Sequence, residues 1–104
     1  MKPLGFAPRV EAEIEAAGDY YEAQRTGLGL EFLDAIDEGL LRLVERPRSH
    51  PFALGAVLEE EIRQVFVRRF PYRIVFRERE GDLLVLACMH ARREPGYWRS
   101  RGDD

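Results

Sequence analysis

The segment IRQVFVRRFPYRIVFREREGDLLVLACMH, residues 62–90, decides the fold because the hydrophobic period changes to two where it begins. A period of two divides residues 63–69 between two strand faces, with Arg63, Val65, Val67 and Arg69 on one and Gln64, Phe66 and Arg68 on the other. In residues 72–77 it places Tyr72, Ile74 and Phe76 on one face and Arg73 and Arg77 on the other. Residues 80–82, Glu-Gly-Asp, form a turn sequence. Residues 83–89 are apolar throughout, which is typical of a strand covered on both faces. The segment therefore predicts three strands, the last of them central.

The residues before this segment favour helices. Apolar side chains recur at spacings of three and four residues, at Val10, Ile14, Ala17 and Tyr21. This spacing predicts an amphipathic helix that begins at Pro8 and ends near Arg25. A second helix is expected from about Leu30 to Glu45, where Pro47 stops it. With a weak strand at Leu4 to Ala7, the expected fold is α+β: an N-terminal helical hairpin packed on a small twisted antiparallel sheet, followed by a short C-terminal segment.

Length and composition indicate one soluble domain over residues 1–104, with 45% apolar and 34% charged residues. The chain shows no basic-then-apolar leader and no apolar run near 18 residues, so a cytoplasmic location is expected. Cys88 is the only cysteine and is expected to be a buried apolar residue. His50 and His90 lack metal-ligand spacing, and we predict no metal and no cofactor.

The net charge of −3 is unevenly divided along the chain. Residues 1–61 carry 13 acidic and 6 basic side chains, whereas residues 62–104 carry 10 basic and 6 acidic ones. A basic face on an acidic body can bind phosphate or an acidic partner selectively. Every cation except Lys2 is arginine, which suits binding of phosphate or carboxylate and is equally well explained by codon usage.

Three segments together resemble the RelE/ParE superfamily of type II toxin–antitoxin toxins. They are DYYEAQRTGLGLEFLDAI, IRQVFVRRFPYRIVFR and LLVLACMHARREPGYWRSR, in this order over nearly the whole chain. The pattern is closer to the ParE-type plasmid stabilisation branch than to the RelE ribonucleases. The resemblance implies a small α+β toxin in a hetero-oligomeric complex with a cognate antitoxin, which wraps it in an extended segment and blocks it.

RelE-type toxins cleave messenger RNA in the ribosomal A site, a reaction that needs proton transfer and cations around the phosphate. Where that branch has a lysine pair before the first central strand, this chain has Glu59-Glu60-Glu61, which repel phosphate. The residues that remain for a ribonuclease site are Arg68, Arg73, His90, Arg93 and Tyr97, with His90 as the possible base.

ParE-type toxins poison DNA gyrase by binding and stabilising a cleaved complex, which needs a shaped surface and no acid/base pair. The expected target-binding residues are Arg92, Arg93, Tyr97, Trp98 and Arg101, because Trp, Tyr and Arg dominate interface hot spots. The antitoxin is expected over the hairpin groove and the basic end of the sheet, with Phe6, Val10, Arg73 and Arg93 as contacts. Gyrase poisoning is the leading hypothesis, ribosome-dependent cleavage is the alternative, and a non-toxic RNA-binding accessory domain is a third.

Several of these residues also have purely structural interpretations. Arg63 is expected to pair with Asp34 or Asp37 of the second helix, and Tyr72 and Phe76 to join the core. Arg73 and Arg77 share a strand face that could be solvated, and Trp98 could pack back on the sheet. The aromatic residues Tyr20, Tyr21 and Phe32 are expected at the helix–helix seam.

Overall fold

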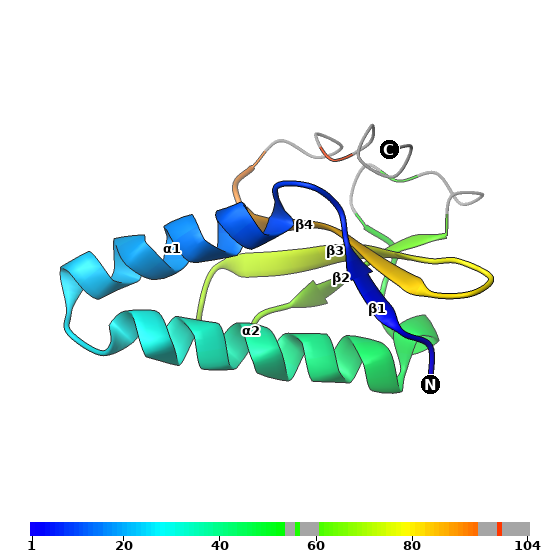
Figure 1. Ribbon diagram of the computed structural model, residues 1–104, viewed down its shortest axis with the longest axis horizontal. Helices are drawn as coiled ribbons and strands as arrows, with labels where there is room; N and C mark the ends of the chain where they lie inside the picture. The colour runs from blue at the N-terminus through cyan, green and yellow to red at the C-terminus, as the bar shows by residue number, and fades with distance from the viewer. Residues whose placement is uncertain (54–55, 57–60, 94–97, 99–104) are drawn as a thin grey trace.

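Two helices pack on one face of a four-stranded sheet in the computed structural model of the chain, which describes residues 1–53, 56, 61–93 and 98 (Figure 1). The elements follow in this order: β1 (Leu4–Phe6), α1 (Val10–Gln24), α2 (Leu28–Glu45), the 3-10 turn η1 (Pro47–Ser49), β2 (Ile62–Phe66), β3 (Tyr72–Glu78) and β4 (Leu83–His90). This arrangement confirms the predicted α+β fold with an N-terminal helical hairpin. None of the helices in these residues is long and apolar enough to cross a membrane.

The strands are ordered β1-β4-β3-β2. The β2–β3 and β3–β4 pairs are antiparallel, and β4 lies inside the sheet as its uniform hydrophobicity predicts. The expectation of a wholly antiparallel sheet is wrong for β1, which pairs with β4 in parallel and places Phe6 opposite Val85. Two helices and two strands separate β1 from β4 in the chain, and such a long connection permits parallel pairing.

The residue immediately before each helix has a left-handed backbone conformation. Arg9 has φ 78° and delays α1 to Val10, two residues after the predicted start. Gly27 has φ 91°, and α2 begins directly after it, two residues earlier than predicted. The carboxylate of Glu22 accepts hydrogen bonds from the N–H groups of Gly27 and Gly29 at 3.0–3.1 Å, so it caps α2 from the preceding helix.

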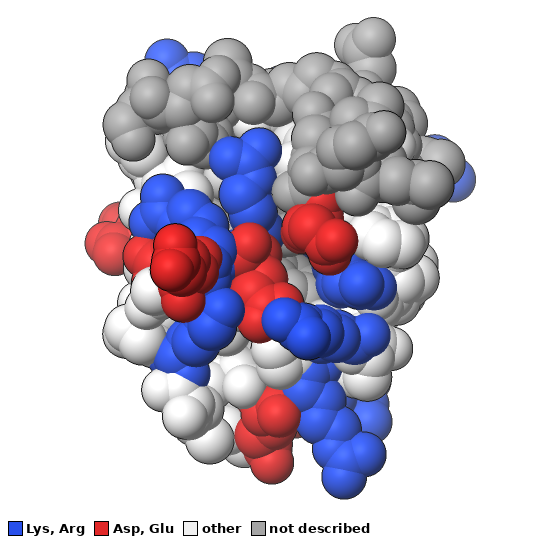
Figure 2. All heavy atoms as spheres, turned by 90° about the vertical axis from the view of Figure 1, so that its right-hand side faces the viewer, with Lys and Arg blue, Asp and Glu red and all other residues white. Residues whose placement is uncertain are grey.

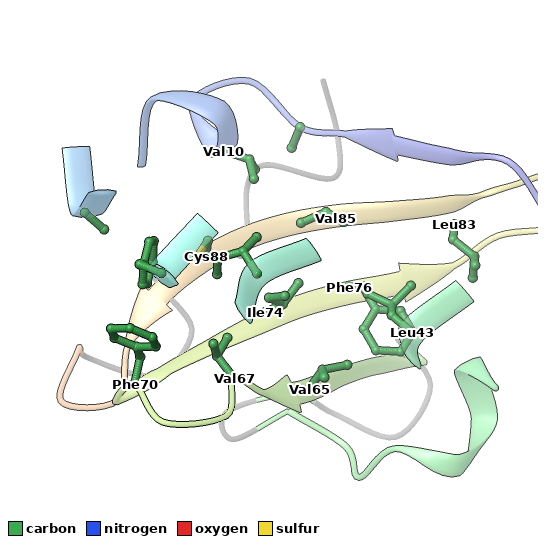
Figure 3. Packing of buried hydrophobic residues seen from close by; sticks show 14 residues of the cluster. Val10, Leu43, Val65, Val67, Phe70, Ile74, Phe76, Leu83, Val85 and Cys88 are labelled. Carbon is green, nitrogen blue, oxygen red and sulfur yellow. The ribbon is translucent and has the colours of Figure 1, made fainter. Parts of the chain in front are cut away.

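The main core lies between the hairpin and the sheet (Figure 3). Phe32, Ile36 and Leu43 of α2 meet Ile74 and Phe76 of β3 there, all at 2% exposure or less. Because side chains alternate along β3, Ile74 and Phe76 point toward the helices, as predicted. Tyr21 and Phe32 stack at the helix seam with ring centroids 5.2 Å apart, whereas Tyr20 is 60% exposed.

A second, smaller cluster covers the other face of the sheet. It contains Val75 of β3, Leu86 and Met89 of β4, and Trp98, which is 1% exposed. The β3–β4 register shifts between Val75 and Phe76, so Val75 faces Ala87 while Phe76 faces Val85. Because both faces are covered, every residue of β4 except His90 is buried.

Candidate functional site

A tight turn at the end of β4 presents the arginine pair. The backbone N–H of Arg93 donates to the carbonyl oxygen of His90 at 2.9 Å, and the N–H of Arg92 donates to His90 Nδ1 at 3.1 Å. Both arginines are exposed. The ring of His90 meets the ring of Tyr72 edge-on at 5.3 Å. The turn therefore holds two cations side by side at one end of the sheet.

Arg73 lies on the opposite face of β3 from Tyr72 and is only 6% exposed. Its Nη1 donates to Gln64 Oε1 at 3.2 Å, and its Nε has no acceptor among the described residues. The expectation that Arg73 belongs to a solvated face is wrong, because the cluster around Trp98 covers that side of the sheet. A side chain buried to this extent offers little surface to a phosphate or to an antitoxin.

Arg68 occupies the loop between β2 and β3, where its side chain is 70% exposed. Its Nε lies 3.7 Å from Oε1 of Glu38, a residue of α2. The neighbouring Arg69 pairs with Glu31 of α2 at 2.8 Å, and Arg25 pairs with the same carboxylate at 3.0 Å. Two acids on one face of α2 therefore hold this loop against the hairpin.

Two of the ribonuclease candidates lie on opposite faces of the sheet. His90 packs against Tyr72 on the helix side of the sheet, Arg73 lies on the other side, and Arg68 faces α2. Acid/base cleavage requires its groups within hydrogen-bond reach of a single phosphate, and the sheet separates the buried Arg73 from His90. The fourth and fifth candidates are Arg93, in the terminal turn, and Tyr97, which lies outside the described residues.

Besides Arg73, two of the predicted contact residues are buried. Trp98 is 1% exposed and packs on the sheet, so its interpretation as an exposed target anchor is wrong and its structural interpretation is confirmed. Val10 is 0% exposed in the main core, which removes it as an antitoxin contact. Phe6 is 37% exposed and stays a candidate. Arg101, like Tyr97, lies outside the described residues.

Arg63 takes a different partner from the one predicted. Its guanidinium donates to the carbonyl oxygen of His50 at 2.7 Å and lies over the ring of Phe52, 4.2 Å from its centroid. Among the residues that the structure describes, its ion-pair partner is Glu61, with Nη2 and Oε2 3.8 Å apart, and it does not pair with Asp34 or Asp37. The expected pairing with helix acids is wrong because the chain after η1 lies beside β2, where Phe52 and Arg63 form an isolated antiparallel β-bridge.

A charged cleft of about 500 Å³ lies at the other end of the sheet, near the β3–β4 hairpin. Figure 2 shows basic and acidic side chains interleaved on this end of the molecule. Glu78 is central to the cleft because Arg48 and Lys2 both pair with it, at 2.9 and 3.2 Å. These partners lower the pKa of Glu78, and the hydrogen bond from Arg48 contributes most to this change. Sequence reasoning missed this cleft because residues 2, 48 and 78 are far apart in the chain. Because its basic and acidic side chains pair with one another, the cleft joins β3 to the N-terminus and to η1 and is not an anion-binding site.

Comparison with known proteins places this geometry in a family. No curated protein matches the chain. A solved structure titled "Chromosomal ParDE TA system from P. aeruginosa" shares the fold, with a TM-score of 0.60 and 17% identity over 86% of this chain and 96% of that one. The family model described as ParE toxin of type II toxin-antitoxin system, parDE, matches residues 4–95. The chain therefore belongs to the ParE family of type II toxin–antitoxin toxins.

Proposed function

We propose that this toxin arrests growth by binding and poisoning DNA gyrase, and that a cognate antitoxin neutralises it in the cytoplasm. The observation that carries the choice of mechanism is the burial of Arg73 on the face of the sheet opposite His90, which takes one of the ribonuclease cations out of reach of the possible base. A toxin that binds its target does not need a base and a cation side by side. It needs a rigid surface that presents anchors.

The exposed turn that carries Arg92 and Arg93 is the proposed anchor. It follows directly from the buried strand β4, and the bond from the Ala91 N–H to the Pro71 carbonyl oxygen at 2.7 Å ties it to the β2–β3 loop. The backbone of the turn therefore has little conformational freedom left to lose on binding, which favours affinity. Two adjacent guanidiniums suit an acidic protein surface or the phosphates of gyrase-bound DNA.

Purified toxin should test this directly in a gyrase reaction with supercoiled plasmid and ATP. We expect accumulation of linear, protein-linked DNA, and we expect the Arg92→Ala/Arg93→Ala double variant to lose that product at unchanged melting temperature. Arg46→Ala, which removes an exposed arginine just beyond α2, is the matched control and should poison like the wild type.

Pulse labelling after induction gives the second readout. DNA synthesis should fall before protein synthesis. An early fall in protein synthesis, together with cleaved messenger RNA, would instead establish the ribonuclease alternative and refute the gyrase proposal.

A further inference from the structure

One residue, His90, accepts two of the hydrogen bonds that shape the arginine turn at the end of β4. Its carbonyl oxygen accepts the N–H of Arg93 at 2.9 Å, which is the ordinary closure of a β-turn. Its ring nitrogen Nδ1 lies 3.1 Å from the backbone nitrogen of Arg92. The second bond is made by a side chain, so it depends on which residue stands at position 90.

This side-chain bond fixes where the proton of the imidazole lies. A backbone N–H can only donate, so Nδ1 of His90 accepts, and the proton of the neutral ring is then on Nε2. The edge-on contact with the ring of Tyr72, 5.3 Å away on β3, holds the imidazole in this orientation. A general base would use the lone pair that the Arg92 N–H already occupies, which also argues against His90 as the base of a ribonuclease.

The bond follows the pattern of an Asx turn. In such a turn the side-chain oxygen of Asn or Asp accepts the N–H two residues further along the chain, and here Nδ1 of His90 takes the place of that oxygen. The bond from the Ala91 N–H to the Pro71 carbonyl oxygen fixes where the turn begins. The bond to the imidazole orients the next peptide group, which joins Ala91 to Arg92 and precedes both arginine side chains.

The other histidine of the chain, His50, has the opposite role in its hydrogen bond. Its Nε2 lies 3.2 Å from the carbonyl oxygen of Arg42, which can only accept, so this nitrogen donates. A second proton on the His50 ring leaves that donor in place. A second proton on the His90 ring turns Nδ1 into a donor that faces another donor, the Arg92 N–H. Of these two hydrogen bonds, protonation of the ring breaks only the one at His90.

We propose that His90 is the positioning residue of the arginine anchor: its neutral ring holds the Arg92 N–H and thereby sets the direction in which Arg92 and Arg93 meet the target. The inference rests on the proposed function, because it concerns the turn that is proposed to bind gyrase. It assigns no chemistry to His90 beyond the acceptance of one hydrogen bond.

Acid should loosen the anchor for the same reason. Histidine side chains take up a proton between about pH 5 and 8. The charged and titratable groups described around the His90 ring are the phenol of Tyr72 on β3, the guanidiniums of Arg92 and Arg93, and the carboxylate of Glu13 on α1, which accepts the N–H of residue 88 at 3.3 Å. Protonation removes the acceptor and adds a third cation beside the two arginines, so target binding should weaken as pH falls.

The decisive experiment compares His90→Asn with His90→Leu. Both replacements remove the ring and its contact with Tyr72, and the two new side chains have the same branched shape. Asparagine keeps an acceptor for the N–H two residues further on, and leucine does not. In the gyrase reaction, His90→Asn should yield linear DNA at the toxin concentration that the wild type needs. His90→Leu should need about fivefold more, the factor that one ordinary hydrogen bond supplies.

A pH series gives a readout that a purely structural role of the ring would not change. From pH 8 to pH 6, the wild type should come to need about fivefold more toxin relative to His90→Asn at the same pH, a ratio that cancels the pH dependence of gyrase itself. His50→Gln, which keeps a donor for the Arg42 carbonyl oxygen, is the matched control and should follow the wild type.

Two readouts without gyrase separate this inference from the proposed function. In the toxin alone, the Arg92 amide should exchange its hydrogen with solvent about fivefold faster in His90→Leu than in His90→Asn. Growth arrest by induced toxin without antitoxin should rank the variants in the same order. If this order holds while the wild type yields no linear DNA, gyrase is refuted and the positioning role is supported. Equal amide exchange or equal potency of the two variants overturns the positioning role, as does a wild type that follows His90→Asn through the pH series.

Discussion

The contact between the two helices predicts opposite effects for two chemically identical substitutions, Gly29→Ala and Gly18→Ala. At Gly29 the new Cβ would stand 2.7 Å from the Gly18 carbonyl oxygen and 3.0 Å from Glu22 Cβ and Oε1. The first neighbour is backbone and has no rotamer by which to move away. At Gly18 the nearest atom is Leu33 Cδ2 at 3.6 Å, an ordinary contact.

The magnitudes follow from three contributions. Overpacking costs about 1–3 kcal/mol, and displacement of Glu22 from the Gly29 N–H removes a hydrogen bond worth about 1 kcal/mol. Alanine regains about 0.5–1 kcal/mol of helix propensity. Gly29→Ala should therefore lower the free energy of unfolding by about 1–3 kcal/mol, whereas Gly18→Ala should raise it by up to about 1 kcal/mol.

Urea unfolding of antitoxin-free toxin, followed by far-ultraviolet circular dichroism, measures both changes. In thermal unfolding, the melting temperature of Gly29→Ala should fall by about 4–12 °C, because 1 kcal/mol corresponds to about 4 °C for a domain of this size. Equal unfolding midpoints for the two variants would show that the helices separate freely at their crossing and would refute the argument from their close approach.

Three further predictions concern buried or paired groups. Arg73→Met should leave the toxin as stable as the wild type or more stable in urea, because it removes a buried guanidinium whose Nε has no acceptor in the described part of the chain. A loss above about 2 kcal/mol would contradict this. Arg69 and Arg25 lower the pKa of Glu31, so its ion pairs stabilise the fold above the ordinary carboxyl pKa and cease to do so as pH falls. The urea midpoint of Glu31→Gln should accordingly lie below that of the wild type at pH 7, and the difference should shrink as pH falls below the ordinary carboxyl pKa. A difference independent of pH would argue against the pairing. Burial raises the pKa of Cys88 to about 12, so a thiol reagent at pH 8 should label it only at the rate of unfolding, and rapid labelling of folded toxin would be inconsistent with its position in the core.

Alternation within strands was sufficient to predict the interior of the sheet. Tyr72, Ile74 and Phe76 face the helical hairpin because side chains alternate along a strand. The uninterrupted apolar run of β4 indicates a strand that is covered on both faces of the sheet. Alternation does not tell what covers the opposite face. Arg73 was therefore placed in solvent, although Trp98, 25 positions further along the chain, lies in the cluster on that side.

The residues that sequence reasoning misplaced depend on contacts between distant segments. Arg63 was paired with helix acids because charge was the only criterion, whereas its guanidinium lies between the carbonyl oxygen of His50 and the ring of Phe52. The close approach of the two helices depends on Gly18 and Gly29 facing each other, which helical periodicity within either segment does not reveal. The charge count places most of the acids in residues 1–61, but only the fold shows that Leu30 and Leu33 of α2 lie beside acids of α1.

The parallel pairing of β1 with β4 has a consequence for the order of events during synthesis. β1 leaves the ribosome first, yet the strand that it pairs with is the last of the four to be made. The hairpin likewise waits for β3 and β4 before its apolar face is covered. A nascent chain that ends before residue 83 lacks the strand on which β1 and β3 both pair. The sheet of this toxin can therefore be completed only after most of the chain has been synthesised, and until then the apolar face of the hairpin stays uncovered.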